Sequence, residues 1–213
     1  MSTRVVRALL FTCLGSTLAG CGLFPPLTGT VRSLEGKVEN GSYTAPDGSF
    51  SLQVPHQDNY ELMWLFAKEQ AGPDGFYVSF GPAAFDKTIY RCSVSPRASG
   101  ASTGDLSATC HHLVDVTRPL LEPMTDTPLE VVSERGGDLD GKPAHFIRLK
   151  QEAPAGTVAT RPAVIVHEAC LVRHGDRFAF TWVQTYEGEG WVRRGIDADR
   201  FARSVVVLPD RDR

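Results

Sequence analysis

The sequence lacks a hydrophobic run that could cross a membrane as a helix. Its longest mostly apolar stretch, Ala8–Leu18, extends about 16 Å as a helix, against roughly 30 Å of hydrocarbon in a bilayer. The chain also lacks an excess of one charge, because 22 basic and 25 acidic residues leave a net charge of -3. A basic face for a polyanion is therefore not indicated, and we predict no nucleic-acid partner.

Several chemical motifs are missing as well. There is no H-E-x-x-H or C-x-x-C pattern for a metal, and no glycine-rich loop with a following Lys that could hold a phosphate. What is present is ordinary for a globular domain: 42% hydrophobic, 22% charged and 9% aromatic residues exclude a disordered, collagen-like or coiled-coil chain. A length of 213 residues favours one compact domain.

The N-terminus has the three regions of a secretory signal peptide. Arg4 and Arg7 are followed by the apolar stretch Ala8–Leu18 and then by small residues. This stretch is apolar on all sides, whereas a short helix buried in a soluble domain is amphipathic. We therefore expect residues 1–20 to be a signal peptide that is removed.

Leu18-Ala19-Gly20-Cys21 resembles the lipobox of bacterial lipoproteins, in which Leu and two small residues precede a Cys. The resemblance implies cleavage before Cys21, a diacylglycerol on its sulfur and acylation of the new amine. Two or three such chains hold a protein stably on a bilayer. Gly22 stands where inner-membrane lipoproteins commonly have Asp, which implies the outer membrane with the domain facing the periplasm.

The chain has 5 cysteines, of which Cys13 leaves with the signal peptide and Cys21 is lipidated. Cys92, Cys110 and Cys170 remain in an oxidising compartment, where one disulfide and one buried thiol is the simplest arrangement. We expect the disulfide between Cys92 and Cys110, because a strand and the following helix can face each other. A bond between Cys92 and Cys170 is the alternative.

The lipidated Cys21 is expected to open a tether over residues 21–42, since two prolines and several glycines oppose regular structure there. We expect a single domain over residues 43–208 and a tail over residues 209–213. Alternating hydrophobic residues between turn dipeptides predict strands. The expected strands are at 50–54, 61–68, 76–80, 88–95, 129–135, 145–151, 164–173, 177–186 and 205–207. Short connections between them favour antiparallel pairing.

Two segments have the period of a helix. From Asp105 to Leu121 the apolar residues fall on one stripe, which comprises Leu106, Cys110, Leu113, Val114 and Leu120. The second helix is expected over Asp197–Ser204, with acids in its first turn and Arg203 in its last. The predicted fold class is α+β, a mainly antiparallel sheet covered by one longer helix and one short C-terminal helix.

The two ends of the predicted domain resemble those of Mog1 and PsbP-like domains. Tyr43–Pro55 has a tyrosine, a turn and an alternating strand that ends in Pro, and Phe201–Val206 has the closing pattern. The resemblance covers a small part of the chain and supports the fold. It also implies an accessory or binding module, without assigning a role to any residue.

Ser102 lies in Gly100-Ala101-Ser102-Thr103-Gly104, the G-x-S-x-G pattern of a serine hydrolase elbow. An elbow follows a buried strand, whereas Ser95–Ser99 is polar and contains a proline. We therefore interpret this segment as a small-residue loop in which Ser102 can cap a helix. A small periplasmic hydrolase that uses Ser102 stays as the alternative.

Cys110-His111-His112 places three potential metal ligands side by side. Neighbours on a helix point about 100° apart and cannot all face one ion. Cys110 belongs to the apolar stripe, and His145 and His167 occur singly in predicted strands. We therefore predict no metal and no other cofactor.

Acidic residues in two expected turns, Asp138 with Asp140 and Glu187 with Glu189, are interpreted as solvated groups. Trp191 follows the second pair beside glycines and is a possible contact for a carbohydrate or a protein. Its alternative role is an anchor at the edge of the core.

Together these features predict a lipid-anchored protein of the bacterial cell envelope with a non-catalytic binding or accessory domain. Its expected partners are the membrane, through the lipid on Cys21, and another envelope protein. The alternatives are the hydrolase that uses Ser102 and a structural component of an envelope assembly. Lack of a catalytic constellation in the sequence favours the first of the three.

Overall fold

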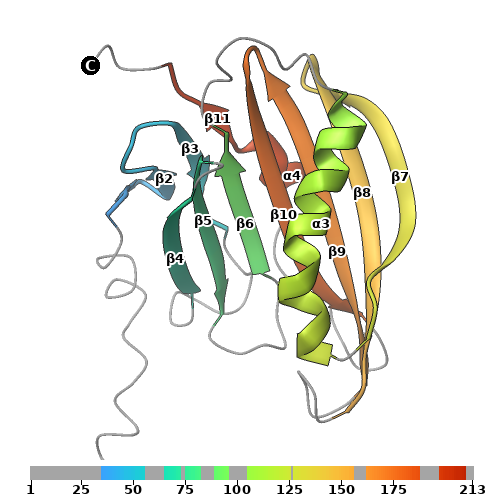
Figure 1. Cartoon of the computed structure of the whole chain (residues 1–213). Coiled ribbons are helices and arrows are strands. Elements are labelled where there is room, and N and C mark those ends of the chain that lie inside the picture. The colour runs from blue at the N-terminus through green and yellow to red at the C-terminus, as the bar shows by residue number, and fades with distance from the viewer. Residues whose placement is uncertain are drawn as a thin grey trace, which may run out of the picture.

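The computed structural model describes residues 35–55, 65–72, 75–82, 89–95, 105–125, 127–155, 162–187 and 197–209. Cys21, Ser102 and Trp191 lie outside these ranges, as do the expected signal peptide and residues 210–213. The described residues form two antiparallel sheets and two helices (Figure 1). Neither of these two helices combines the length and the hydropathy needed to cross a membrane.

The larger sheet has the strand order β4-β5-β6-β10-β9-β8-β7, and every neighbouring pair is antiparallel. Its strands are β4 (Leu65–Gly72), β5 (Gly75–Pro82), β6 (Ile89–Val94), β7 (Glu130–Leu139), β8 (Lys142–Ala153), β9 (Ala163–His174) and β10 (Arg177–Glu187). The turn expected at Asp138 and Asp140 is confirmed, and it is a hairpin turn at Asp140-Gly141. Both residues have positive φ, 54° and 78°, as a two-residue hairpin turn requires.

The smaller sheet has the order β1-β2-β3-β11, with β1 (Lys37–Glu39), β2 (Ser42–Thr44), β3 (Phe50–Gln53) and β11 (Val206–Val207). Among the described residues paired structure therefore begins at Lys37, inside the segment 21–42 that we expected to be a tether. The reason is a second hairpin turn at Asn40-Gly41, with φ of 49° and 76°. Asn-Gly is a strong hairpin signal in a sequence, and the interpretation of residues 21–42 as a tether missed it.

Helix α3 (Leu106–Thr125) packs against β8, β9 and β10, and in Figure 1 it lies in front of them. The predicted apolar stripe is confirmed where side chains are described, since Cys110 is 0% and Val114 1% exposed. The helix continues past Leu121, its expected end. Proline in a helix removes one backbone hydrogen bond, and Pro119 does not end this one.

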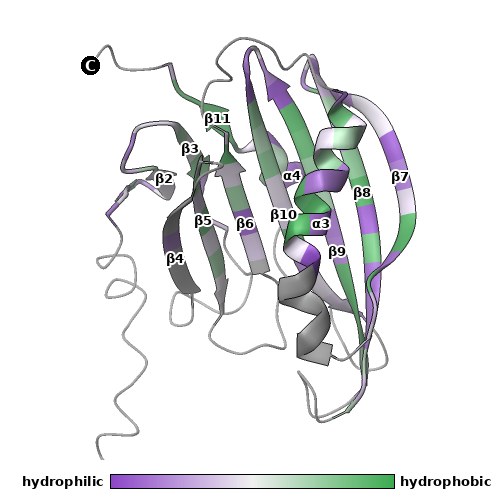
Figure 2. Cartoon of the chain, viewed as in Figure 1, coloured by the Kyte–Doolittle hydropathy of each residue, from purple (hydrophilic) through white to green (hydrophobic). Residues whose placement is uncertain are grey.

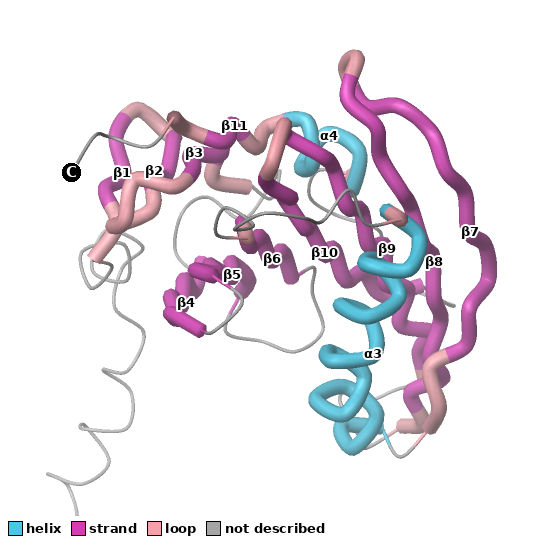
Figure 3. The backbone as a smooth tube through the Cα atoms, turned by 45° about the horizontal axis from the view of Figure 1, so that its top comes forward, coloured by secondary structure: helices cyan, strands magenta, loops and turns pink. Residues whose placement is uncertain are grey.

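Helix α4 (Ala198–Arg203) begins at Asp197, whose side chain accepts a hydrogen bond of 2.6 Å from the backbone N–H of Arg200. Phe201 on this helix is fully buried, with its ring 5.0 Å from that of Tyr90 on β6. Figure 3 shows α4 near β11. The expected short C-terminal helix is therefore confirmed.

The larger sheet is buried on both faces at its central strands β9 and β10, whereas β7 at its edge is mostly exposed; side chains alternate between the two sides of a strand. On β10, Ala179 and Val183 join the cluster that includes β3 and α4, whereas Phe180 and Trp182 join the one that includes α3. Figure 2 shows hydrophobic and hydrophilic residues alternating along β8. The α+β class, with mostly antiparallel strands, one longer and one shorter helix, is confirmed.

Candidate functional site

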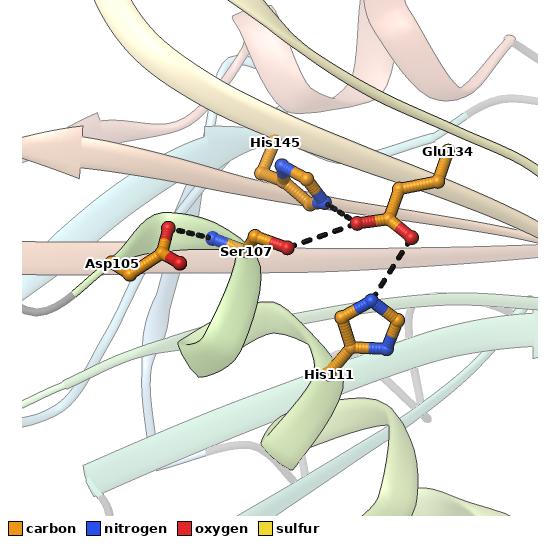
Figure 4. A network of polar contacts seen from close by, with 5 residues as sticks. All are labelled: Asp105, Ser107, His111, Glu134 and His145. Atoms are coloured by element: carbon orange, nitrogen blue, oxygen red, sulfur yellow. Dashed lines mark hydrogen bonds and ion pairs between the residues drawn. The ribbon is translucent and has the colours of Figure 1, made fainter.

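Three polar side chains converge on the carboxylate of Glu134 in β7 (Figure 4). Ser107 Oγ donates a hydrogen bond of 2.9 Å to Glu134 Oε1, and His145 Nε2 lies 2.8 Å from the same oxygen. His111 Nε2 lies 3.0 Å from Glu134 Oε2. The group joins α3, β7 and β8, and we call these four residues the Glu134 cluster.

Local structure explains why these side chains meet. Ser107 and His111 are four residues apart on α3 and therefore share a face, and Asp105 accepts the backbone N–H of Ser107 at 3.0 Å. On the sheet, His145 pairs with Gly136 of β7. Glu134 lies two residues before Gly136 and on the same face, so that His145 reaches it diagonally across a position without a side chain.

The Glu134 cluster lies half-way between the interior and the solvent. The side chain of His145 is 8% exposed, that of Glu134 34% and that of His111 41%. The hydrogen bond from Ser107 is the main cause that lowers the pKa of Glu134, and the bonds from His111 and His145 lower it further. The carboxylate is therefore ionised in neutral solution.

The cluster offers two kinds of chemistry. The first is structural. Its hydrogen bonds connect α3 to the β7 edge of the sheet, and this stabilising role alone is enough to explain the cluster. As ligands, His111, Glu134 and His145 present two imidazole nitrogens and a carboxylate, with all ligand atoms within 4.8 Å of one another. Two His and one carboxylate are a donor set that Zn²⁺ takes in proteins.

Cys110, His111 and His112 were predicted not to face one metal ion together. In the structure the three side chains do point in different directions. Cys110 is in the core, His112 is exposed, and His111 contacts Glu134. The sequence reasoning missed Glu134 and His145 as partners of His111. No local pattern connects residues 111, 134 and 145; only the β7–β8 register and the docking of α3 bring them together.

The expected disulfides are corrected by the structure, in which Cys92, Cys110 and Cys170 are free and buried. Cys92 and Cys110 belong to separate core clusters on opposite faces of the larger sheet. Cys92 and Cys170 both pair with Thr181 of β10, one from each side. Two strand spacings separate them by about 9 to 10 Å between Cα atoms, beyond the roughly 7 Å limit for a disulfide.

Burial also makes these thiols poor nucleophiles. It raises the pKa of Cys110 and of Cys170 to about 12 in each case, and it raises that of Cys92 further. The thiolate is the reactive form of cysteine. None of the three is therefore suited to catalysis.

A second polar group lies inside the sheet, on the face that α3 packs against. His167 of β9 is 1% exposed, with its ring centroid 5.2 Å from that of Trp182. Among the described residues, neither ring nitrogen of His167 has a hydrogen-bond partner, nor has the indole nitrogen of Trp182. Burial, assisted by the nearby charge of Arg91, lowers the pKa of His167 to about 3. This imidazole is therefore neutral around pH 7.

The turn acids have structural partners where they are described. Asp138 accepts the backbone N–H of Gly141 at 2.7 Å, and Asp140 pairs with Arg203 of α4. Glu187 pairs with Arg148 at 3.3 Å. These contacts hold hairpins and a helix in place.

With this geometry the chain has the fold of a PsbP-like domain. It is similar to the solution structure of cyanobacterial PsbP (CyanoP) from Synechocystis sp. PCC 6803, at 13% identity and a TM-score of 0.50, over 81% of this chain and 96% of that one. The Ran-binding protein Mog1p of Saccharomyces cerevisiae is similar at 12% identity and a TM-score of 0.44, over 82% of this chain and 96% of that one. No protein-family model and no curated protein matches the sequence. The expected resemblance to the PsbP type is confirmed for the fold.

Proposed function

We propose that this chain is a lipid-anchored protein of the bacterial outer membrane whose PsbP-like domain binds an envelope protein without catalysis. The observation that carries the proposal is the sequence Leu18-Ala19-Gly20-Cys21 directly after a basic and apolar leader. An acylated Cys21 holds the domain at the membrane, because each buried CH₂ group contributes about 0.8 kcal/mol.

The chemistry of the described residues supports a role without catalysis. A serine nucleophile needs a base at its hydroxyl, in most enzymes an imidazole. Ser107 instead donates to Glu134, whose lowered pKa makes it a weak base. Neither Ser107 nor any of the three buried thiols is therefore an activated nucleophile. PsbP-like domains mostly act as accessory or binding modules, which agrees with the proposal as a class of role.

The anchor is tested by replacing one sulfur. Cys21→Ala is expected to leave the protein soluble or unprocessed, whereas the wild-type protein fractionates with the outer membrane and its mass includes acyl chains. Cys13→Ala is the matched control, because Cys13 leaves with the leader and its loss changes neither location nor mass of the mature protein. A Cys21→Ala protein found in the membrane at the mature size contradicts the proposal.

The binding role is tested in intact cells. Crosslinking followed by mass spectrometry is expected to recover a defined envelope protein bound to the domain, in the wild type and not in the mislocalised Cys21→Ala variant. The enzyme alternative makes a different prediction. A hydrolase activity of the purified protein that disappears in Ser102→Ala replaces the binding proposal with that alternative.

A further inference from the structure

We propose that His111, Glu134 and His145 form a Zn²⁺ site with three protein ligands and one open position. The site goes beyond the proposed function and does not depend on it. The two histidine Nε2 atoms and one carboxylate oxygen are the ligands, from α3, β8 and β7 respectively.

The distances favour a metal site that forms with small movements. Ligands bound at about 2.0 to 2.1 Å in a tetrahedron lie roughly 3.3 Å from one another. Glu134 already has its oxygens 2.8 Å and 3.0 Å from the Nε2 atoms of His145 and His111. Because all the ligand atoms lie within 4.8 Å of one another, the two that are farthest apart need to approach by at most about 1.5 Å to reach this separation.

The surroundings of the ligands resemble those of metal sites in proteins, where neighbouring groups hold the ligands in place. His145 is nearly buried and is held by the sheet, so that its ring offers a fixed point of attachment. Ser107 donates to Glu134 and orients the carboxylate, as groups behind a metal ligand commonly do. Gly136 has open space where a side chain would be, which leaves room beside His145.

The partial exposure of the other two ligands fits an open fourth position. Glu134 and His111 are 34% and 41% exposed, so that zinc can enter from solvent and a water molecule can complete the tetrahedron. A fully closed structural site has four protein ligands instead. The arrangement therefore fits reversible zinc binding that fastens α3 to the sheet when the metal is bound.

A purely structural hydrogen-bond cluster and a zinc site make different predictions. Hydrogen bonds need only the protons of the two histidines, and added zinc changes nothing. A zinc site saturates at one equivalent and raises the melting temperature, because the metal binds the folded state only. It also places Co²⁺ in a tetrahedral site of N and O ligands with visible d–d absorption.

The test uses the full protein as purified from cells in detergent, stripped with EDTA and dialysed. Titration with ZnCl₂ in a calorimeter, and with CoCl₂ in a spectrophotometer, is expected to saturate at one metal per chain. Glu134→Gln keeps the size and the hydrogen bond from Ser107 but removes the anionic ligand, and His111→Ala removes an exposed ligand. Each is expected to weaken zinc binding by at least about tenfold.

His112→Ala is the matched control, because His112 is the exposed neighbour of His111 on α3 and is not part of the cluster. It is expected to bind zinc like the wild type. Circular dichroism of the metal-free variants checks that they are folded, and Cys21→Ala, which tests the anchor, is expected to bind zinc normally. A wild-type Kd weaker than about 1 mM, tight binding that survives both ligand variants, or an equal loss in His112→Ala overturns the site.

Discussion

The buried imidazole of His167 is expected to make the folded protein less stable as the pH falls below neutral. In the folded state burial lowers its pKa to about 3, with a further contribution from Arg91, whereas the value for an unfolded chain is 6.5. Between these two values the unfolded state binds a proton that the folded state does not. The contribution of neutral His167 to the free energy of unfolding is therefore fully present above pH 6.5, and it is lost as the pH falls from 6.5 toward 3.

The size of the effect follows from these two pKa values. At pH 5 an unfolded histidine is almost fully protonated, while folded His167 is still neutral. Protonation then favours the unfolded state by about 2 kcal/mol relative to pH 7.5, since one pKa unit corresponds to about 1.4 kcal/mol. The loss is large against a typical stability of about 5 to 15 kcal/mol.

The assay is urea unfolding of the wild type and His167→Leu at pH 7.5 and pH 5. Leucine has a similar volume and no polar atoms, so that it also removes two ring nitrogens that have no hydrogen-bond partner in the described part of the chain. We expect the variant to be at least as stable as the wild type at pH 7.5. The free energy of unfolding of the variant minus that of the wild type is expected to be about 2 kcal/mol larger at pH 5 than at pH 7.5.

Other groups contribute to the acid sensitivity of both proteins and cancel in this comparison. Burial, with the charge of Lys142, lowers the pKa of His174 to about 4, and the bonds of Glu134 lower its pKa. Both shifts also destabilise the fold at low pH. If the difference between wild type and His167→Leu is the same at both pH values, the assignment of a neutral buried His167 is wrong.

Three more predictions concern the core, the thiols and a helix cap. Phe201→Ala is expected to lower the free energy of unfolding by about 3 to 5 kcal/mol, because Phe201 is fully buried; a loss below about 1 kcal/mol in urea unfolding rejects this packing. Cys92, Cys110 and Cys170 are expected to be inert to a thiol reagent in the native mature protein and to react completely in urea without reductant. Reaction of a single thiol in urea indicates a disulfide and contradicts the structure. Asp197→Ala is expected to lower the unfolding free energy by about 1 kcal/mol, because Asp197 caps α4, whereas Asp197→Asn is expected to keep most of it.

The hairpins were predictable because their information is local. Asp140-Gly141 has the turn residues that such hairpins require, and alternating hydrophobic residues on either side indicate the strands. The same rule applies to Asn40-Gly41, where a short β1 with mixed residues hid the pattern. The stripe of α3 was predictable in the same way, because it follows from the helical repeat alone.

The disulfide prediction failed for a reason of geometry. A sequence shows that Cys92 and Cys110 are apolar positions, but it does not show on which side of the sheet each one lies. Cys92 and Cys170 share a face and are still two strands apart, because the chain places β10 between β6 and β9. The face on which a cysteine lies excludes the bond between Cys92 and Cys110, and the order of the strands excludes the bond between Cys92 and Cys170. Both depend on long-range pairing.

The sequence by itself determined the turns, the periodicity of the strands and the helix stripe, and it carries the lipobox on which the proposed anchor depends. Those features involve residues within a few positions of one another. Only the tertiary structure decided that Glu134 meets His111 and His145, that His167 is buried with no hydrogen-bond partner among the described residues, and that β11 joins β3 in a second sheet. These contacts join residues far apart in the chain, and they depend on strand register and helix docking, which the whole core determines together.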